Sequence, residues 1–162
     1  MKVEEFKDAL VEYYQGELMG EAVIEQMIKN YDEPERHAKL AVLLQLETET
    51  KARLRPAMME LGMRLDEEDA PRAEARQIAE AFKSLSWEQA MGAMCEQLPP
   101  VIAHYRDIAD KAPQAYRDLA ESMFLHEKSL LDFAEMEVKG EIEHSIDVVS
   151  EQLHFKLPAY GG

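Results

Sequence analysis

The chain has 162 residues, 46% of them hydrophobic, and this length and composition predict one folded domain spanning residues 1–162. Its 33 acidic and 18 basic residues give a net charge of −15, which disfavours binding to nucleic acid or to an anionic membrane surface. No apolar run approaches the roughly 20 residues that cross a bilayer. The N-terminal residues do not resemble a signal peptide, and a single cysteine, Cys95, is compatible with a reducing compartment. We therefore expect a cytoplasmic protein with no nucleic-acid and no membrane partner.

The composition also predicts an all-α fold, because helix-forming residues are abundant and β-branched residues are scarce. Four long helices are expected near residues 3–30, 33–61, 86–111 and 113–139. Short turns at Asp32 and Pro113 join them into two antiparallel hairpins. The longer connection between the hairpins contains a charged loop at 63–70 and a short helix that begins at Asp69-Ala70-Pro71 and ends near Leu85.

Two antiparallel hairpins joined by one long crossover have the connectivity of a ferritin-like four-helix bundle. The bundle core is expected over about residues 3–139, followed by an extra C-terminal helix at 141–153 and an irregular tail from Phe155 onward. Pro56 predicts a kink in the second long helix. The pair Pro99-Pro100 predicts a kink or a break in the third.

The first long helix carries an inward-facing stripe with a glutamate at its centre. At alternating spacings of three and four residues, the stripe consists of Phe6, Leu10, Tyr13, Glu17, Gly20, Ile24, Met27 and Tyr31. Glu47 and Glu127 interrupt the stripes of the second and fourth long helices in the same way. A carboxylate in an apolar core is costly unless its charge is compensated. The recurrence therefore indicates a polar site inside the bundle.

The three glutamates are expected at one level of the bundle. Glu17 and Glu47 are equally distant from the turn near Asp32, so they should face each other across the first hairpin. Glu127 is at a similar distance from the turn at Pro113, which places it at the same height in the second hairpin. Three interior carboxylates would repel one another unless they are protonated, hydrated or bound to a cation. A divalent metal ion with oxygen ligands is the simplest of these solutions.

With Glu17, Glu47 and Glu127 at these positions, the chain resembles the ferritin-like superfamily, and within it the rubrerythrin-type diiron-carboxylate proteins. The resemblance covers about residues 3–139. Glu17 matches the ligand of the family's first helix, Glu47 the first ligand of its second helix, and Glu127 the first ligand of its fourth. The resemblance implies a bundle that binds iron or manganese. It also implies a role as an oxidoreductase, in peroxide handling or in metal storage.

The ligand set of this resemblance is incomplete. The family has Glu-x-x-His on its second and fourth helices, whereas Thr50 and Leu130 stand where the histidines would be. On the third helix the expected glutamate position holds Met94, or Leu98 in a register shifted by one turn. Half of the family's ligands are therefore missing from the chain.

Two other side chains are candidate substitutes for the missing ligands. Glu21 lies one turn from Glu17, and His126 borders the inward stripe of the fourth long helix. The candidate metal ligands are therefore Glu17, Glu47, Glu127, Glu21 and His126. One bound ion is as consistent with this set as two.

A second interpretation requires no metal. Each of the three glutamates could lie at a bundle edge, solvated or paired with Lys51, Arg53 or Lys128. The protein would then be a non-catalytic helical bundle that acts through homo-oligomeric or other protein–protein association. The apolar faces of the C-terminal helix and of the short helix at Ile78 and Phe82 would serve a homodimer.

Overall fold

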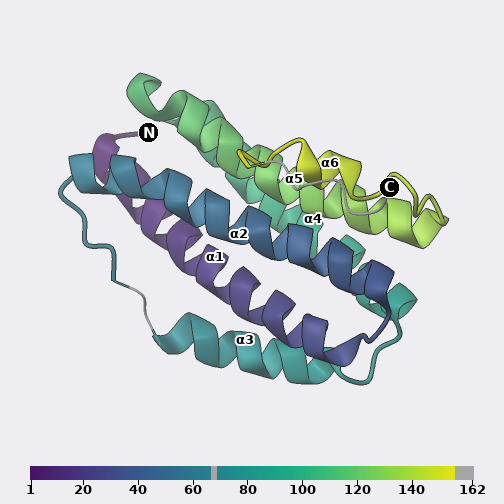
Figure 1. Ribbon diagram of the computed structural model, residues 1–162. Coiled ribbons are helices and arrows are strands. Elements are labelled where there is room, and N and C mark those ends of the chain that lie inside the picture. Colours follow the sequence, from purple (N-terminus) through teal and green to yellow (C-terminus); the bar gives the residue numbers. More distant parts are fainter. Residues whose placement is uncertain (67–68, 156–162) are drawn as a thin grey trace.

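The computed structural model describes residues 1–66 and 69–155, and every regular element in these ranges is a helix (Figure 1). The elements are α1 (Val3–Asn30), α2 (Pro34–Glu60), α3 (Asp69–Phe82), α4 (Trp87–Lys111), the 3-10 turn η1 (Gln114–Tyr116), α5 (Arg117–Lys139) and α6 (Asp147–Ser150). The predicted all-α fold is confirmed for these residues. Residues 67–68 of the predicted loop and 156–162 of the predicted tail lie outside them. None of the described helices is long and apolar enough to cross a membrane.

The four long helices form two antiparallel hairpins, as the predicted turns require (Figure 1). Residues 31–33 join α1 to α2, and Pro34 occupies the first turn of α2, where a backbone N–H is not needed. Ala112, Pro113 and η1 join α4 to α5. In the connection between the hairpins, α3 packs along α1 (Figure 1). All four long helices contribute buried side chains to one hydrophobic cluster.

Local sequence signals determine the ends of α4 and α5. Ser86 caps α4, because its Oγ accepts the N–H of Gln89 at 3.3 Å and the Gln89 side chain accepts the N–H of Ser86 at 2.9 Å. Gly140 ends α5 with a φ of 80°, a left-handed conformation that favours glycine. The predicted break in α4 is not found, and α2 also continues through its proline. Pro99 and Pro100 are exposed, so carbonyl groups that lose a helical donor near them can be hydrated.

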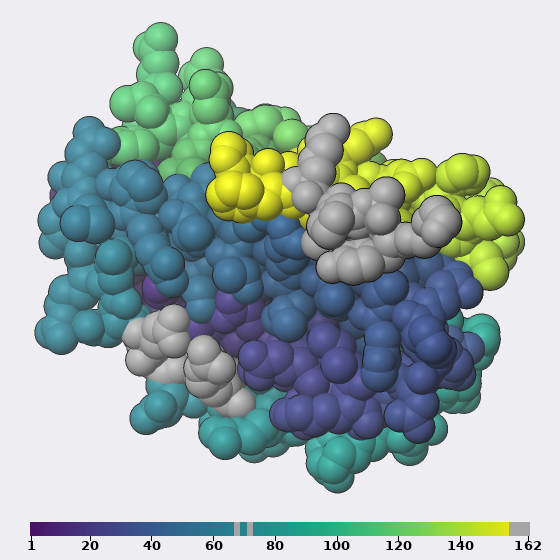
Figure 2. All heavy atoms as spheres, viewed as in Figure 1, coloured from purple at the N-terminus to yellow at the C-terminus, as the bar shows by residue number. Residues whose placement is uncertain are grey.

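The C-terminal segment is less helical than predicted, because one of its carbonyl groups binds side chains. Only α6 is helical within the predicted 141–153. The carbonyl of Ile142 accepts Lys39 Nζ at 2.9 Å and Ser145 Oγ at 3.1 Å in place of a helical N–H. The segment nevertheless lies against α2 and α5 (Figure 2) and buries Val149. Val149 and Leu153, on the apolar face that suggested a homodimer, therefore pack within the chain, whereas Ile142 is 44% exposed.

The last turn of α5 buries a carboxylate. Val138, an apolar residue of this turn, is 53% exposed. Glu137 is buried instead, and it accepts hydrogen bonds from Lys39 Nζ at 2.7 Å, from Trp87 Nε1 at 2.7 Å and from Ser145 Oγ. Three donors compensate the cost of burying the charge. This network attaches the C-terminal segment to both hairpins.

A polar layer divides the interior into two hydrophobic clusters. One cluster includes Phe6, Leu10, Tyr13, Leu18, Leu54, Met58, Tyr105, Ile108 and Met123. The other includes Ile24, Met27, Leu40, Leu43, Leu46, Trp87, Met91, Leu130 and Phe133. Glu47 on α2 and His126 on α5 lie between the residues that their helices contribute to the two clusters, and Glu17 on α1 lies next to Leu18 of the first cluster. All three side chains are buried. The candidate site lies in this layer.

Candidate metal centre

Three buried side chains from three helices converge in the polar layer. Glu17 on α1, Glu47 on α2 and His126 on α5 are 2%, 4% and 1% exposed, respectively. His126 Nε2 lies 3.8 Å from Oε1 of Glu17 and 3.6 Å from Oε1 of Glu47. One potential ligand atom from each residue lies within 4.8 Å of the other two. Two carboxylates and an imidazole at this spacing could hold one metal ion.

The close approach of α1 to the Glu47 carboxylate requires a glycine at residue 20. A Cβ at Gly20 would lie 2.3 Å from Oε2 and 2.6 Å from Cδ of Glu47. Both distances are too short for non-bonded atoms, so any other residue would displace the Glu47 side chain. Gly20 therefore makes room for Glu47 beside Glu17.

A hydroxyl group on α2 orients His126. Thr50 Oγ1 lies 2.9 Å from Nδ1 of His126, in a contact that is fully buried. The tautomer that donates its Nδ1–H to Thr50 leaves the lone pair of Nε2 facing Glu17 and Glu47. Burial alone would lower the pKa of His126, but the neighbouring carboxylates, Glu47 foremost, outweigh burial and the pKa is raised.

Glu17 has the least satisfied carboxyl group of the layer. Within residues 1–66 and 69–155, no group donates a hydrogen bond to its buried Oε2 atom. Burial, followed by the charges of Glu47 and Glu127, raises the pKa of Glu17 well above its ordinary value. A cation between the carboxylates would reverse this effect, since it would compensate both charges and give Oε2 a partner.

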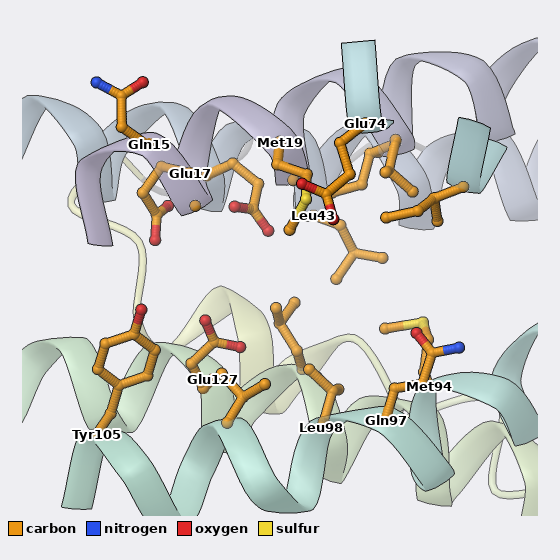
Figure 3. A pocket seen from close by; sticks show the side chains of 18 of the residues that line it. Gln15, Glu17, Met19, Leu43, Glu74, Met94, Gln97, Leu98, Tyr105 and Glu127 are labelled. Atoms are coloured by element: carbon orange, nitrogen blue, oxygen red, sulfur yellow. The ribbon is translucent and has the colours of Figure 1, made fainter. Parts of the chain in front are cut away.

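Glu127 borders a central cavity beside the three converging residues (Figure 3). The cavity has a volume of about 660 Å³ and is lined by residues of α1 to α5. Figure 3 shows Glu17 on one wall, with Glu127 and Tyr105 on the opposite wall. Burial, against the opposing charge of His126, raises the pKa of Glu127 to about 7. The protonation state of Glu127 therefore changes near neutral pH.

Glu21, the remaining predicted ligand, is bound to other side chains. Its Oε2 forms an ion pair with Lys51 Nζ at 2.5 Å, and its Oε1 accepts the hydroxyl of Thr48 at 2.8 Å. A pairing of a glutamate with Lys51, considered in the metal-free interpretation, is therefore found at Glu21. The structure does not bring Glu21 into the group formed by Glu17, Glu47 and His126.

The helix α4, described over its whole length, adds no carboxylate to the polar layer. Met94 and Leu98, the two positions at which the resemblance predicted a glutamate, line the cavity, and Glu96 is exposed. Tyr105 also lines the cavity, whereas the hydroxyl of Tyr13 on α1 donates to the carbonyl of Met123 at 2.8 Å. The side of the cavity formed by α4 therefore carries Tyr105, Gln97 and His104 as polar residues, but no carboxylate.

Two residues of the site, Thr50 and Gly20, have roles that were not predicted from the sequence. Thr50 stands where the resemblance predicted a histidine, and in the structure its hydroxyl group contacts His126 of α5. This role depends on how α5 is rotated, for which the sequence contains no signal. Gly20 could have been identified, because a glycine on a stripe of large residues indicates a close approach.

Comparison of the chain with protein-family models, with curated proteins and with solved structures found no match. The function must therefore be argued from the geometry. That geometry is a buried set of Glu17, Glu47 and His126, with Glu127 on the wall of an adjoining cavity. Such a set can bind a cation, hold protons, or do both.

Proposed function

We propose that the protein is a ferritin-like four-helix bundle in which Glu17, Glu47 and His126 bind one divalent metal ion, iron or manganese. The observation that carries the proposal is the buried Oε2 atom of Glu17, which accepts no hydrogen bond in the described part of the chain. Buried polar atoms rarely lack a partner. Two carboxylates and an imidazole are ligands that Fe²⁺ and Mn²⁺ accept, and a metal ion would relieve the repulsion between the carboxylates.

The residues around the three ligands have separate roles in this proposal. Thr50 orients His126, and Gly20 leaves the space that the Glu47 carboxylate occupies. Glu127 can hold or release a proton at the cavity wall near neutral pH, because its pKa is raised to about 7. A bound iron or manganese ion would supply Lewis-acid and redox chemistry.

An oxidoreductase or peroxide-handling role suits this arrangement better than metal storage. Storage requires space for many ions, whereas the ligands converge on one buried position. The cavity next to them is lined mainly by apolar side chains, and the carboxylates in its wall outside this set, Glu12, Glu74 and Glu127, belong to three different helices. A small molecule could instead reach the polar layer through this cavity.

Metal binding can be measured directly. The protein is purified without added metal, its metal content is determined by elemental analysis, and Mn²⁺ is titrated into the metal-free form. At a hundredfold excess over the dissociation constant, Mn²⁺ should raise the free energy of unfolding by about 2.7 kcal/mol. Glu17→Gln and Glu47→Gln should abolish this effect, and Glu96→Gln, which changes an exposed glutamate, should retain it. An unchanged unfolding free energy of the wild type would refute the metal site and favour the association interpretation.

A further inference from the structure

The central cavity has the size and lining of a small-molecule site. Its volume of about 660 Å³ lies within the range of roughly 300–1,000 Å³ that is typical of ligand pockets. Most of its wall is apolar and includes Ile24, Met27, Leu43, Met94, Leu98 and Leu130. Water gains few hydrogen bonds against such a wall. The cavity is therefore suited to a hydrocarbon group.

Two of the lining carboxyl groups, those of Glu17 and Glu127, lie at one end of the cavity, whereas Glu74 lies further along. Figure 3 shows Glu17, Glu127 and Tyr105 at this end, with Leu98 and Met94 further along. Glu17 is 2% exposed, and its Oε2 is without a hydrogen bond in the described structure. A ligand that matches this lining has a polar group at one end and an apolar body.

The charge of the residues that line the cavity determines which polar group of a ligand is favoured. Five of the lining residues are glutamates and one is a histidine, and no lysine or arginine is found among the described residues that line it. A carboxylate or a phosphate would be repelled, whereas an ammonium group would donate charge-assisted hydrogen bonds to a carboxylate. Glu17, Glu47 and Glu127 all line the cavity, and Glu127 is the one of them that does not belong to the group formed with His126. Its carboxyl group is therefore the one we assign to this contact.

We propose that the cavity binds an apolar primary amine, with its hydrocarbon chain among the apolar side chains of α1, α4 and α5 and its ammonium group at the carboxylate of Glu127. This inference goes beyond the metal site and does not depend on it. The apolar wall and Glu127 belong to the chain itself. Failure of metal binding would therefore leave the amine site unaffected, and the reverse also holds.

The amine site is tested on metal-free protein with a fluorescent reporter of apolar cavities, N-phenyl-1-naphthylamine. Decylamine, 1-decanol and decanoate, which have the same chain length and differ in head group, are then compared as competitors below their micelle-forming concentrations. Decylamine should displace the reporter at a concentration at least about tenfold lower than 1-decanol, because a charge-assisted hydrogen bond is worth more than tenfold in affinity. Decanoate should be the weakest competitor.

Variants locate the binding to the cavity. Glu127→Gln should remove the advantage of decylamine over 1-decanol. Leu98→Trp and Met94→Trp each fill the cavity and should abolish reporter binding in protein that retains its helical circular dichroism. Met59→Trp, at a residue 65% exposed, is the matched control and should bind normally. Equal displacement by the three competitors, strongest displacement by decanoate, or reporter binding that survives both cavity-filling variants would overturn the proposal.

Discussion

Gly20 and Glu47 are in such close contact that a Cβ at residue 20 would lie 2.3 Å from Oε2 of the glutamate. The atom in conflict is at the end of a flexible side chain, so it can move away without disturbing the backbone. A methyl group at residue 20 should therefore displace a metal ligand and leave the fold intact. A substitution at Gly20 can therefore test the metal site without a large change in the stability of the protein.

Gly20→Ala should fold and lose its affinity for metal. Alanine in a helix is more stable than glycine by roughly 0.5–1 kcal/mol, which offsets the cost of moving the Glu47 carboxylate. Isothermal titration with Mn²⁺ should show at least about a tenfold loss of affinity, comparable to the removal of a supporting contact at a metal site. The unfolding free energy of the metal-free variant should stay within about 1 kcal/mol of the wild type.

Gly16→Ala is the matched control for this prediction. Gly16 is one turn from Gly20 on α1, and a Cβ there would meet nothing within 4 Å. The variant should gain the same helix stability and bind Mn²⁺ as the wild type does. Equal affinities of the two alanine variants would show that Glu47 is not a ligand.

The long helices and their pairing could be predicted because they depend on local signals. Pro34, the capping pair of Ser86 and Gln89, and Gly140 each act on their own helix end. The C-terminal segment could not be predicted in the same way. Its backbone is held by Lys39, a residue far away in the sequence, so its conformation depends on tertiary contacts.

The sequence predicted the level of the site along the helices, but not how α5 is rotated about its own axis. The level of Glu17 and Glu47 follows from the turn between α1 and α2, and both residues are found in the polar layer. Adjacent helical residues point about 100° apart, so packing decides whether His126 or Glu127 of α5 faces the carboxylates. The structure places His126 against them and Glu127 at the cavity.

Thr50→Val should weaken metal binding through His126. The substitution removes the hydroxyl group 2.9 Å from Nδ1 and keeps the shape of the side chain. Loss of such a partner typically lowers metal affinity 10- to 100-fold, and titration with Mn²⁺ should show a decrease in this range. Thr48→Val is the control, because the hydroxyl group of Thr48 donates to Glu21 and not to His126. This variant should bind Mn²⁺ with the affinity of the wild type. Equal losses in both variants would contradict the role of Thr50.

The buried ion pair between Lys39 and Glu137 should contribute strongly to stability. Lys39→Met leaves the Glu137 carboxylate buried without its cation, which should cost about 3 kcal/mol in chemical denaturation. Asp132→Asn breaks the exposed pair with Lys128 and should cost less than about 1 kcal/mol. Similar costs would mean that the network of Lys39, Trp87 and Ser145 around Glu137 is not essential to the fold.

Finally, the stability of metal-free protein should decrease with rising pH because of Glu127. Its pKa is raised from 4.5 to about 7 in the folded state. Below pH 4.5 Glu127 is protonated in both states and costs nothing. Between pH 4.5 and 7 the unfolded chain loses this proton and the folded chain keeps it, so the free energy of unfolding falls, by on the order of 3 kcal/mol for the full shift. The raised pKa values of Glu17 and His126 act in the same direction.

Comparison with Glu127→Gln isolates this contribution. The variant cannot ionise at residue 127, so its unfolding free energy should equal that of the wild type near pH 4 and exceed it increasingly up to pH 7. Urea denaturation at several pH values, with EDTA present to keep metal out, measures the difference. Glu96→Gln, at an exposed position, should differ from the wild type by a small and constant amount. If the curves of Glu127→Gln and the wild type stay parallel over this range, the carboxyl group of Glu127 is hydrated and ionised like one at the surface. The cavity would then be open to water, and Glu127 could not hold a proton at neutral pH.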